Sequence, residues 1–414
     1  MKTHSYIPLL LGVLAMGCGS GKMAPTQPLA ELPIHVWAKK QKAPEREDQL
    51  RLSEVSRLRE GFEGKLLGAA ATDSTSNWVF SPGSANLAMH LVANGAAGSS
   101  QKEFLEALGF GDLKIEDANL SARDLLRKLH AANGRPVAVA NSVWIKDGNQ
   151  IKPGYQATVE DFYGAAVNPF TTADQGKQAI NAWVSENTGG SIPTLIDDLG
   201  EEVEAVLVNT ISFRAKWLHP FEPTKTKDAK FTTAGGQEIS VPTMHQSLKH
   251  AMYFEKPGYQ ALRLPYEGDG FSILLLLPKS GDPKDLLENW DQVLKDQMDW
   301  NDYEVEVALP RFTAESTHDL EPALRSLGFG FAFDGADFSG LASGLRAVSR
   351  VQQKCRIEVN EEGTKADSAV NADMVKSKPL EPLRASFIAD RPFAYVVTGY
   401  GSILFAGVCN DPRG

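Results

Sequence analysis

The sequence predicts an α+β fold, because helical and strand-like patterns occupy different parts of the chain. Residues 50–68 place apolar side chains at helical spacing, and a helix of small residues follows over 84–93. Strand-like runs dominate later: residues 205–213 are nearly all apolar, and residues 303–309 alternate between apolar and polar. Helices and strands that separate along the sequence are typical of the α+β class.

Composition sets the first limits on function. The 414 residues are 42% hydrophobic and 23% charged, so the chain is globular and long enough to bury a large core. A formal net charge of −10 argues against a general nucleic-acid binder, which would present a basic face. Three cysteines are too few for a disulfide framework.

Residues 1–18 are expected to be a signal peptide. Lys2 supplies a positive start, and the apolar run over 7–16 is too short to span a bilayer. Residues 14–18 resemble a bacterial lipobox, which would make Cys18 a lipidated N-terminus. The leucine lies one place further from Cys18 than usual, so cleavage by ordinary signal peptidase remains open. Either route exports the protein. With a lipid on Cys18 it would be anchored to the bacterial cell envelope, at the outer membrane or surface; otherwise it would be periplasmic or secreted.

Residues 19–45 are interpreted as a flexible tether, since four prolines stand there among small and polar residues. Folded sequence is expected from 46 to 414, without an internal repeat or a later linker. The pattern at residues 78–82 predicts a short strand that enters a turn. Residues 137–145 are expected to form a strand, and residues 181–186 are expected to belong to a helix. The apolar run at 205–213 indicates a strand that is buried on both faces.

The stretch from Cys355 to Arg384 has an unusual pattern. Cys355, Ile357 and Val359 alternate with polar residues, as in a half-buried strand, and an acidic turn follows at 361–363. The alternation then resumes, and Lys365 stands among the residues that would face outward. Two prolines end the run, as in an exposed loop. The residues that would share the inward face are all small or apolar: Thr364, Ala366, Ser368, Val370, Ala372 and Met374.

Several motifs resemble those of the serpins. Residues 358–366 are similar to the hinge of the serpin reactive loop, and residues 386–387, 389–393 and 401–407 to the C-terminal signature. Weaker matches occur in family order between about Arg46 and Pro412: residues 80–84, 181–184, 207–221, 241–245, 264–266, 309–312 and 336–340.

The resemblance implies a serpin fold, with three β-sheets, eight or nine helices and an exposed reactive loop at about 361–382. It implies a suicide inhibitor of serine, and possibly cysteine, endopeptidases: the protease cuts the loop, is held as an acyl-enzyme, and the loop inserts as a strand into the central sheet. The small inward face favours inhibition over the alternative, a serpin-fold protein that only binds partners or acts as a chaperone. The hinge residues so implied are Glu361, Glu362, Gly363, Thr364, Ala366, Ser368 and Ala369.

The scissile bond is bounded by the family loop length. Counting from Gly363 puts the cut after Ser377, and counting back from Phe387 puts it near Lys378. A lysine before a proline is a poor substrate, whereas Lys376–Ser377 suits a trypsin-like pocket. We therefore expect cleavage at Lys376–Ser377, with Ser377–Lys378 next and Val375–Lys376 for an elastase-like enzyme.

The resemblance also implies a polar cluster beneath the central sheet, formed by Ser81, Ser84, Asn209 and residue 353. Serpins commonly place a histidine at this last position, where Gln353 stands. Glutamine offers a donor and an acceptor but cannot become charged near neutral pH. The cluster is expected to persist with altered hydrogen bonds, although Gln353 could equally be a buried amide without this role.

An enzyme is not expected. The sequence has no Gly-x-Ser-x-Gly or His-Glu-x-x-His motif, and its eight histidines are scattered. No cofactor or metal is implied, and whether Cys355 and Cys409 pair stays open. The expected partner of a monomeric chain is the target serine endopeptidase, with membrane contact only through a lipid on Cys18.

Overall fold

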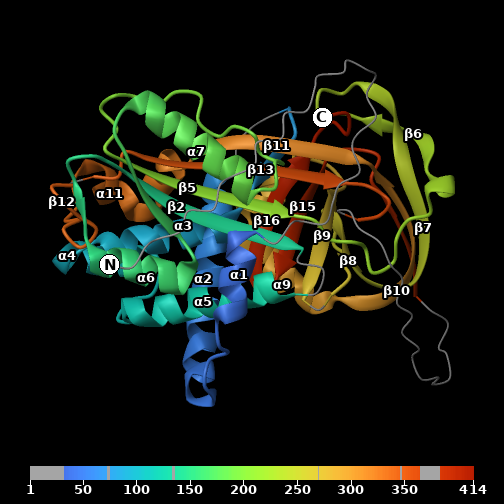
Figure 1. Cartoon of the computed structure of the whole chain (residues 1–414). Coiled ribbons are helices and arrows are strands. Elements are labelled where there is room, and N and C mark those ends of the chain that lie inside the picture. Colours follow the sequence, from blue (N-terminus) through green and yellow to red (C-terminus); the bar gives the residue numbers. More distant parts are fainter. Residues whose placement is uncertain (1–31, 72–74, 133–135, 269, 346, 364–382) are drawn as a thin grey trace, which may run out of the picture.

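A computed structural model describes residues 32–71, 75–132, 136–268, 270–345, 347–363 and 383–414 (Figure 1). No helix among these residues is long and apolar enough to cross a bilayer. The helices are α1 (Pro33–Lys40), α2 (Arg46–Ala70), α3 (Pro82–Gly95), α4 (Gly98–Ala107), α5 (Ile115–Ala131), α6 (Pro153–Tyr163), α7 (Ala173–Asn187), α8 (Lys284–Glu288), α9 (Trp290–Asp296), α10 (Glu321–Leu324) and α11 (Gly330–Asp334).

The strands form one nine-stranded, one five-stranded and one two-stranded sheet in the described part of the chain. Their bounds are β1 (Trp78–Phe80), β2 (Val137–Lys146), β3 (Gln150–Ile151), β4 (Ala166–Phe170), β5 (Ala205–Phe213), β6 (Lys227–Thr232), β7 (Glu238–Glu255), β8 (Tyr259–Pro265), β9 (Phe271–Pro278), β10 (Asn301–Pro310), β11 (Phe312–Asp319), β12 (Ala342–Ser343), β13 (Arg350–Val359), β14 (Leu383–Ile388), β15 (Phe393–Gly399) and β16 (Ser402–Cys409).

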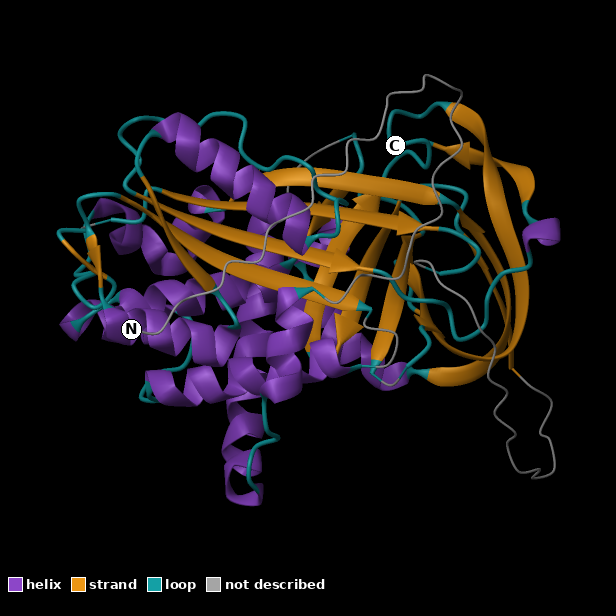
Figure 2. Cartoon of the chain, in the orientation of Figure 1, coloured by secondary structure: helices purple, strands orange, loops and turns teal. Residues whose placement is uncertain are grey.

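The predicted α+β fold with three sheets is confirmed. Helices gather on one side of the molecule and strands extend to the other (Figure 2). The described residues hold eight α-helices of seven or more residues, and α8, α10 and α11 add short turns of four or five.

The five-stranded sheet, in the order β11-β13-β5-β2-β4, is the central sheet of the fold. Strand β5 is buried on both faces, as its apolar run predicts. Val206 and Val208 pack on one face with residues of α7, whereas Leu207 and Ile211 join the main core on the other. That main core includes α3, which begins at the N-cap Ser81 and is buried along most of its length.

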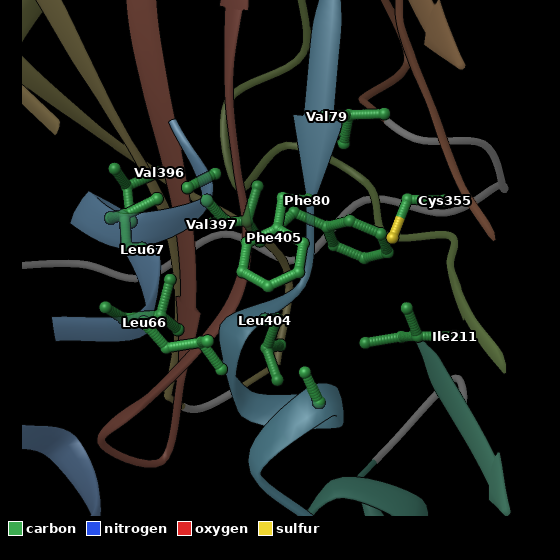
Figure 3. Close-up of a cluster of buried hydrophobic side chains, with 14 of the residues drawn as sticks. Leu66, Leu67, Val79, Phe80, Ile211, Cys355, Val396, Val397, Leu404 and Phe405 are labelled. Carbon is green, nitrogen blue, oxygen red and sulfur yellow. The ribbon is translucent and has the colours of Figure 1, made fainter. Parts of the chain in front are cut away.

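The hydrophobic core beneath this sheet joins the five-stranded and nine-stranded sheets (Figure 3). Cys355 from β13 and Ile211 from β5 point into it beside Phe80 of β1, while Leu404 and Phe405 come from β16 (Figure 3). Around Ile211 and Cys355 this face of β5 and β13 is apolar, and any side chain added between the two strands there must fit an apolar environment.

The expected tether over 19–45 is too long. Residues 33–40 form α1, in which Ile34 is 2% exposed and packs near Ala138 of β2. The prolines that indicated a tether include Pro33, which stands in the first turn of α1, where proline is well tolerated. The folded part therefore begins at least thirteen residues before Arg46.

Two buried histidines fasten α1 to the domain. His35 of α1 and His130 of α5 both approach the carbonyl oxygen of Val137, each at 3.2 Å, with their ring centroids 5.4 Å apart. Burial, together with the charge of His35, lowers the pKa of His130 to about 3, although hydrogen bonds to backbone oppose the shift.

We expect the folded state to lose stability in acid through His130. Its folded pKa lies below the unfolded value of about 6.5, so the unfolded chain binds a proton first, and stability present at neutral pH is lost as the pH falls from about 6.5 towards 3. This one group predicts a loss of about 2 kcal/mol between pH 7 and pH 5. Urea unfolding at both pH values, compared with H130N, measures it; equal losses in both proteins would contradict the assignment.

Candidate functional site

The central sheet contains two neighbouring strands that are only partly paired. Strands β5 and β13 run parallel, and their register joins Arg350–Lys354 to Val206–Thr210. Beyond these residues β13 continues to Val359, paired with β11 on its other side, and β5 continues to Phe213, paired with β2. In the described part of the chain, the facing edges of 355–359 and 211–213 have no strand between them. Such edges are a template for a further strand.

A tight turn stands at the open end of this gap. Asn360 and Gly363 exchange backbone hydrogen bonds of 3.2 Å in each direction, so the chain reverses direction within four residues. Gly363 also forms an antiparallel bridge with Lys216, in the segment that follows β5. Gly363 thus lies between the continuations of β13 and β5, at the first position that an inserted strand would occupy.

Only glycine fits at residue 363. Its φ of +117° is a conformation that other residues rarely adopt. A Cβ atom there would lie 2.4 Å from the amide nitrogen of Trp217 and 2.5 Å from the carbonyl oxygen of Ala215. Both are backbone atoms, so the clash could not be relieved by a side-chain rotation.

Glu361 anchors the turn through its buried carboxylate. Its side chain is 7% exposed and pairs with Arg311, whose Nε donates to the carboxylate at 2.7 Å, and Thr226 donates to the same oxygen. Burial raises the pKa of Glu361, but the hydrogen bonds from Arg311 and Thr226 outweigh it, and the pKa lies below its usual value. Glu361 is therefore a charged anchor at neutral pH.

Replacing Glu361 by lysine is expected to loosen the turn. The change removes charge-assisted hydrogen bonds and sets two cations together, which predicts a loss of about 2–3 kcal/mol. The exposed neighbour Glu362 provides a matched control, since E362K makes the same charge change at the surface. Urea midpoints of the two variants measure the difference, and equal midpoints would show that Glu361 is no anchor.

The structure brings together all four residues of the expected polar cluster. Ser81 and Gln353 form two reciprocal hydrogen bonds: the Ser81 amide donates to Gln353 Oε1 at 2.9 Å, and Gln353 Nε2 donates to the Ser81 carbonyl at 3.0 Å. Gln353 Nε2 also donates to Asn209 Oδ1 at 3.1 Å, and Ser84 Oγ donates to the same oxygen. All four are at most 1% exposed.

The cluster lies where the pairing of β5 and β13 ends. Asn209 and Gln353 are register partners, one residue before the last pair. Asn209 Nδ2 also donates to Asn141 Oδ1 of β2 at 2.7 Å, which adds a fifth member that the sequence interpretation missed. The signal for Asn141 was present, because an amide in the middle of an apolar strand needs a buried partner. The cluster thus connects α3 to three strands of the sheet.

Cys355 follows the cluster on the same face of β13. Its Sγ lies 3.2 Å from Gln353 Oε1, and burial raises the pKa of this thiol well above its usual value. Cys355 and Cys409 are both free, buried thiols, so the pairing left open by the sequence does not occur in this structure.

The remaining site residues lie outside the described residues. These are the scissile-bond candidates, the later hinge positions and the lipidation site: Val375, Lys376, Ser377, Lys378, Thr364, Ala366, Ser368, Ala369 and Cys18. Their roles stay predictions. Within the described ranges, no group of three or more histidine, cysteine, aspartate or glutamate side chains is placed to hold a metal ion.

Comparisons with known proteins agree with this architecture. The family model "Serpin (serine protease inhibitor)" matches residues 60–412. An uncharacterised serpin-like protein of Thermococcus kodakarensis is 31% identical over 355 residues, 82% of each chain. Human neuroserpin is 30% identical over 370 residues, 83% of this chain and 88% of its own. The crystal structure of Serpin48 from the insect Tenebrio molitor has a TM-score of 0.76 and 29% identity, and covers 89% of this chain and all of its own.

Proposed function

The chain belongs to the serpin family, and on that premise we propose that it inhibits trypsin-like serine endopeptidases by loop cleavage, acyl-enzyme trapping and strand insertion. Members of this family are in general protease inhibitors and not catalysts. The observation that carries the proposal is the gap between β5 and β13 that no strand of the described residues fills, with Gly363 at its open end.

The gap supports insertion on physical grounds. A strand between the two edges would pair backbone groups of 355–359 and 211–213 that lack a strand partner among the described residues. Its inward side chains would meet the core around Phe80, Ile211 and Cys355 (Figure 3). The alternating small residues from Thr364 to Met374 suit that position. Pairing of these edges with an inserted strand would release free energy, which would make the intact form a kinetic trap.

The test mixes the purified full chain with trypsin and follows denaturing gels and the mass of the released C-terminal peptide. A covalent band that survives boiling, with a peptide that begins at Ser377, is the expected result. A peptide that begins at Lys378 would keep the inhibitor and move the scissile bond. Clean cleavage without a complex and without a gain in thermal stability would favour a serpin-fold protein that only binds.

We also propose that the chain is exported and carried on a lipid at Cys18. The lipobox-like residues 14–18 support this. Metabolic labelling with a radioactive fatty acid tests it: label should enter the wild-type chain and be absent from C18A, and an unlabelled wild-type chain would exclude lipidation.

A further inference from the structure

A small apolar pocket lies next to the residues that hold the turn at 360–363. It has a volume of about 140 Å³, between the segment after β5 and strands β7 and β8. A cavity of about 150 Å³ accommodates one benzene ring, so this pocket is large enough for a single aromatic ring. Its walls are mainly apolar side chains: Trp217, Phe221, Leu248, Ala251 and Leu264.

One cation in the lining, Arg263, has no anionic partner among the described residues. Arg263 donates from Nη2 to the neutral amide oxygen of Gln297 at 2.7 Å and stacks over Trp300 at 4.9 Å. Among the described residues no ion pair is seen at Arg263, and its buried Nε has no hydrogen-bond acceptor there. The nearby His250, by contrast, is already paired with Asp302 at 2.8 Å. Arginine remains charged in proteins, and Arg263 lines the pocket, so it is available to pair with an anionic group of a bound ligand.

We propose that this pocket binds a small aromatic carboxylate. The ring would pack against Trp217 and Phe221, and the carboxylate would pair with Arg263. Occupancy would stabilise the turn at 360–363 and so slow the insertion of the reactive loop.

The coupling to the turn follows from the two aromatic walls. Trp217 donates from its indole Nε1 to the carbonyl oxygen of Asn360 at 2.8 Å. The backbone amide of Phe221 donates to the carbonyl oxygen of Glu361 at 2.9 Å. Insertion of a strand would extend the turn and break these hydrogen bonds. A ligand shifts this equilibrium only as far as its affinity differs between the two states, and one packed on Trp217 and Phe221 favours the intact turn. This second half of the proposal rests on the proposed function; binding does not.

Binding is tested by calorimetry with 3-phenylpropionate against its neutral amide, on the full chain. An ion pair with a charge-assisted hydrogen bond predicts that the acid binds at least about tenfold more tightly. R263Q should make the acid and the amide equal, and A251F should fill the pocket and abolish both. R384Q is the matched control, because Arg384 is exposed on β14 and pairs with Glu304. Circular dichroism checks that each variant folds.

Equal binding of acid and amide to the wild-type chain, or unchanged binding in A251F, would overturn the site. The coupling is measured without any protease, by hydrogen exchange at the Trp217 indole Nε1–H, which 3-phenylpropionate should slow several-fold. Binding without slower exchange would overturn the coupling alone. A failure of trypsin inhibition would leave both measurements intact, so the two proposals fail separately.

Discussion

Under the proposed mechanism, replacing Ala366 by arginine is expected to turn the protein from an inhibitor into a substrate. Ala366 is on the predicted inward face, and insertion would carry its side chain into the core around Phe80, Ile211 and Cys355. Burying an unpaired cation costs several kcal/mol, and about 1.4 kcal/mol on a barrier slows a step tenfold. Insertion should therefore slow by about 100-fold or more, and the protease would deacylate and leave.

The measurement is the ratio of covalent complex to cleaved inhibitor on gels, at several ratios of protein to trypsin. K365E is the matched control, because Lys365 would face outward and a charge there should be tolerated. If A366R still forms the complex as efficiently as K365E, the proposed strand phase is wrong.

Replacing Gln353 by leucine is expected to weaken the intact fold by about 2–5 kcal/mol. The change leaves the amide and the carbonyl of Ser81 without their partner in a fully buried site, and each orphaned group costs about 1–3 kcal/mol. Urea unfolding measures the loss. The neighbour Gln352 provides the control: it lies on the same strand, and its buried Oε1 has no hydrogen-bond partner. Q352L should be neutral or stabilising, and a similar loss in both variants would contradict a special role for Gln353.

Elements with clear periodicity could be predicted from sequence. The alternation at 355–359 matches the observed burial, with Cys355, Ile357 and Val359 at most 1% exposed. In α2 the prediction was less accurate, because Leu50 is 85% exposed, whereas Arg59 and Glu63 are buried. Those two form an ion pair at 3.4 Å, and Glu63 also accepts hydrogen bonds from Ser402 of β16. Polar residues with a distant partner can thus occupy core positions that periodicity assigns to leucine.

The anchors of the site could not be predicted in the same way. The ion pair between Arg311 and Glu361 joins residues 50 positions apart, and the hydrogen bond from Trp217 to Asn360 spans 143. No local pattern encodes such a contact, because it depends on how β11, β13 and the segment after β5 meet in the sheet. The polar cluster was expected only through family resemblance, which supplied four positions but not Asn141.

The buried thiol of Cys355 offers a way to measure how often β5 and β13 separate. Cys355 is 0% exposed on the inner face of β13, just beyond its last pair with β5. A thiol reagent can reach it only while the strands are apart, so its labelling rate reports how often they separate. Cys409, equally buried in β16 of the other large sheet, should react only on wider unfolding. Peptide mapping of both labels would therefore give two rates in the same unmodified chain. The labelling rate of Cys355 would report local opening, and that of Cys409 would report global unfolding.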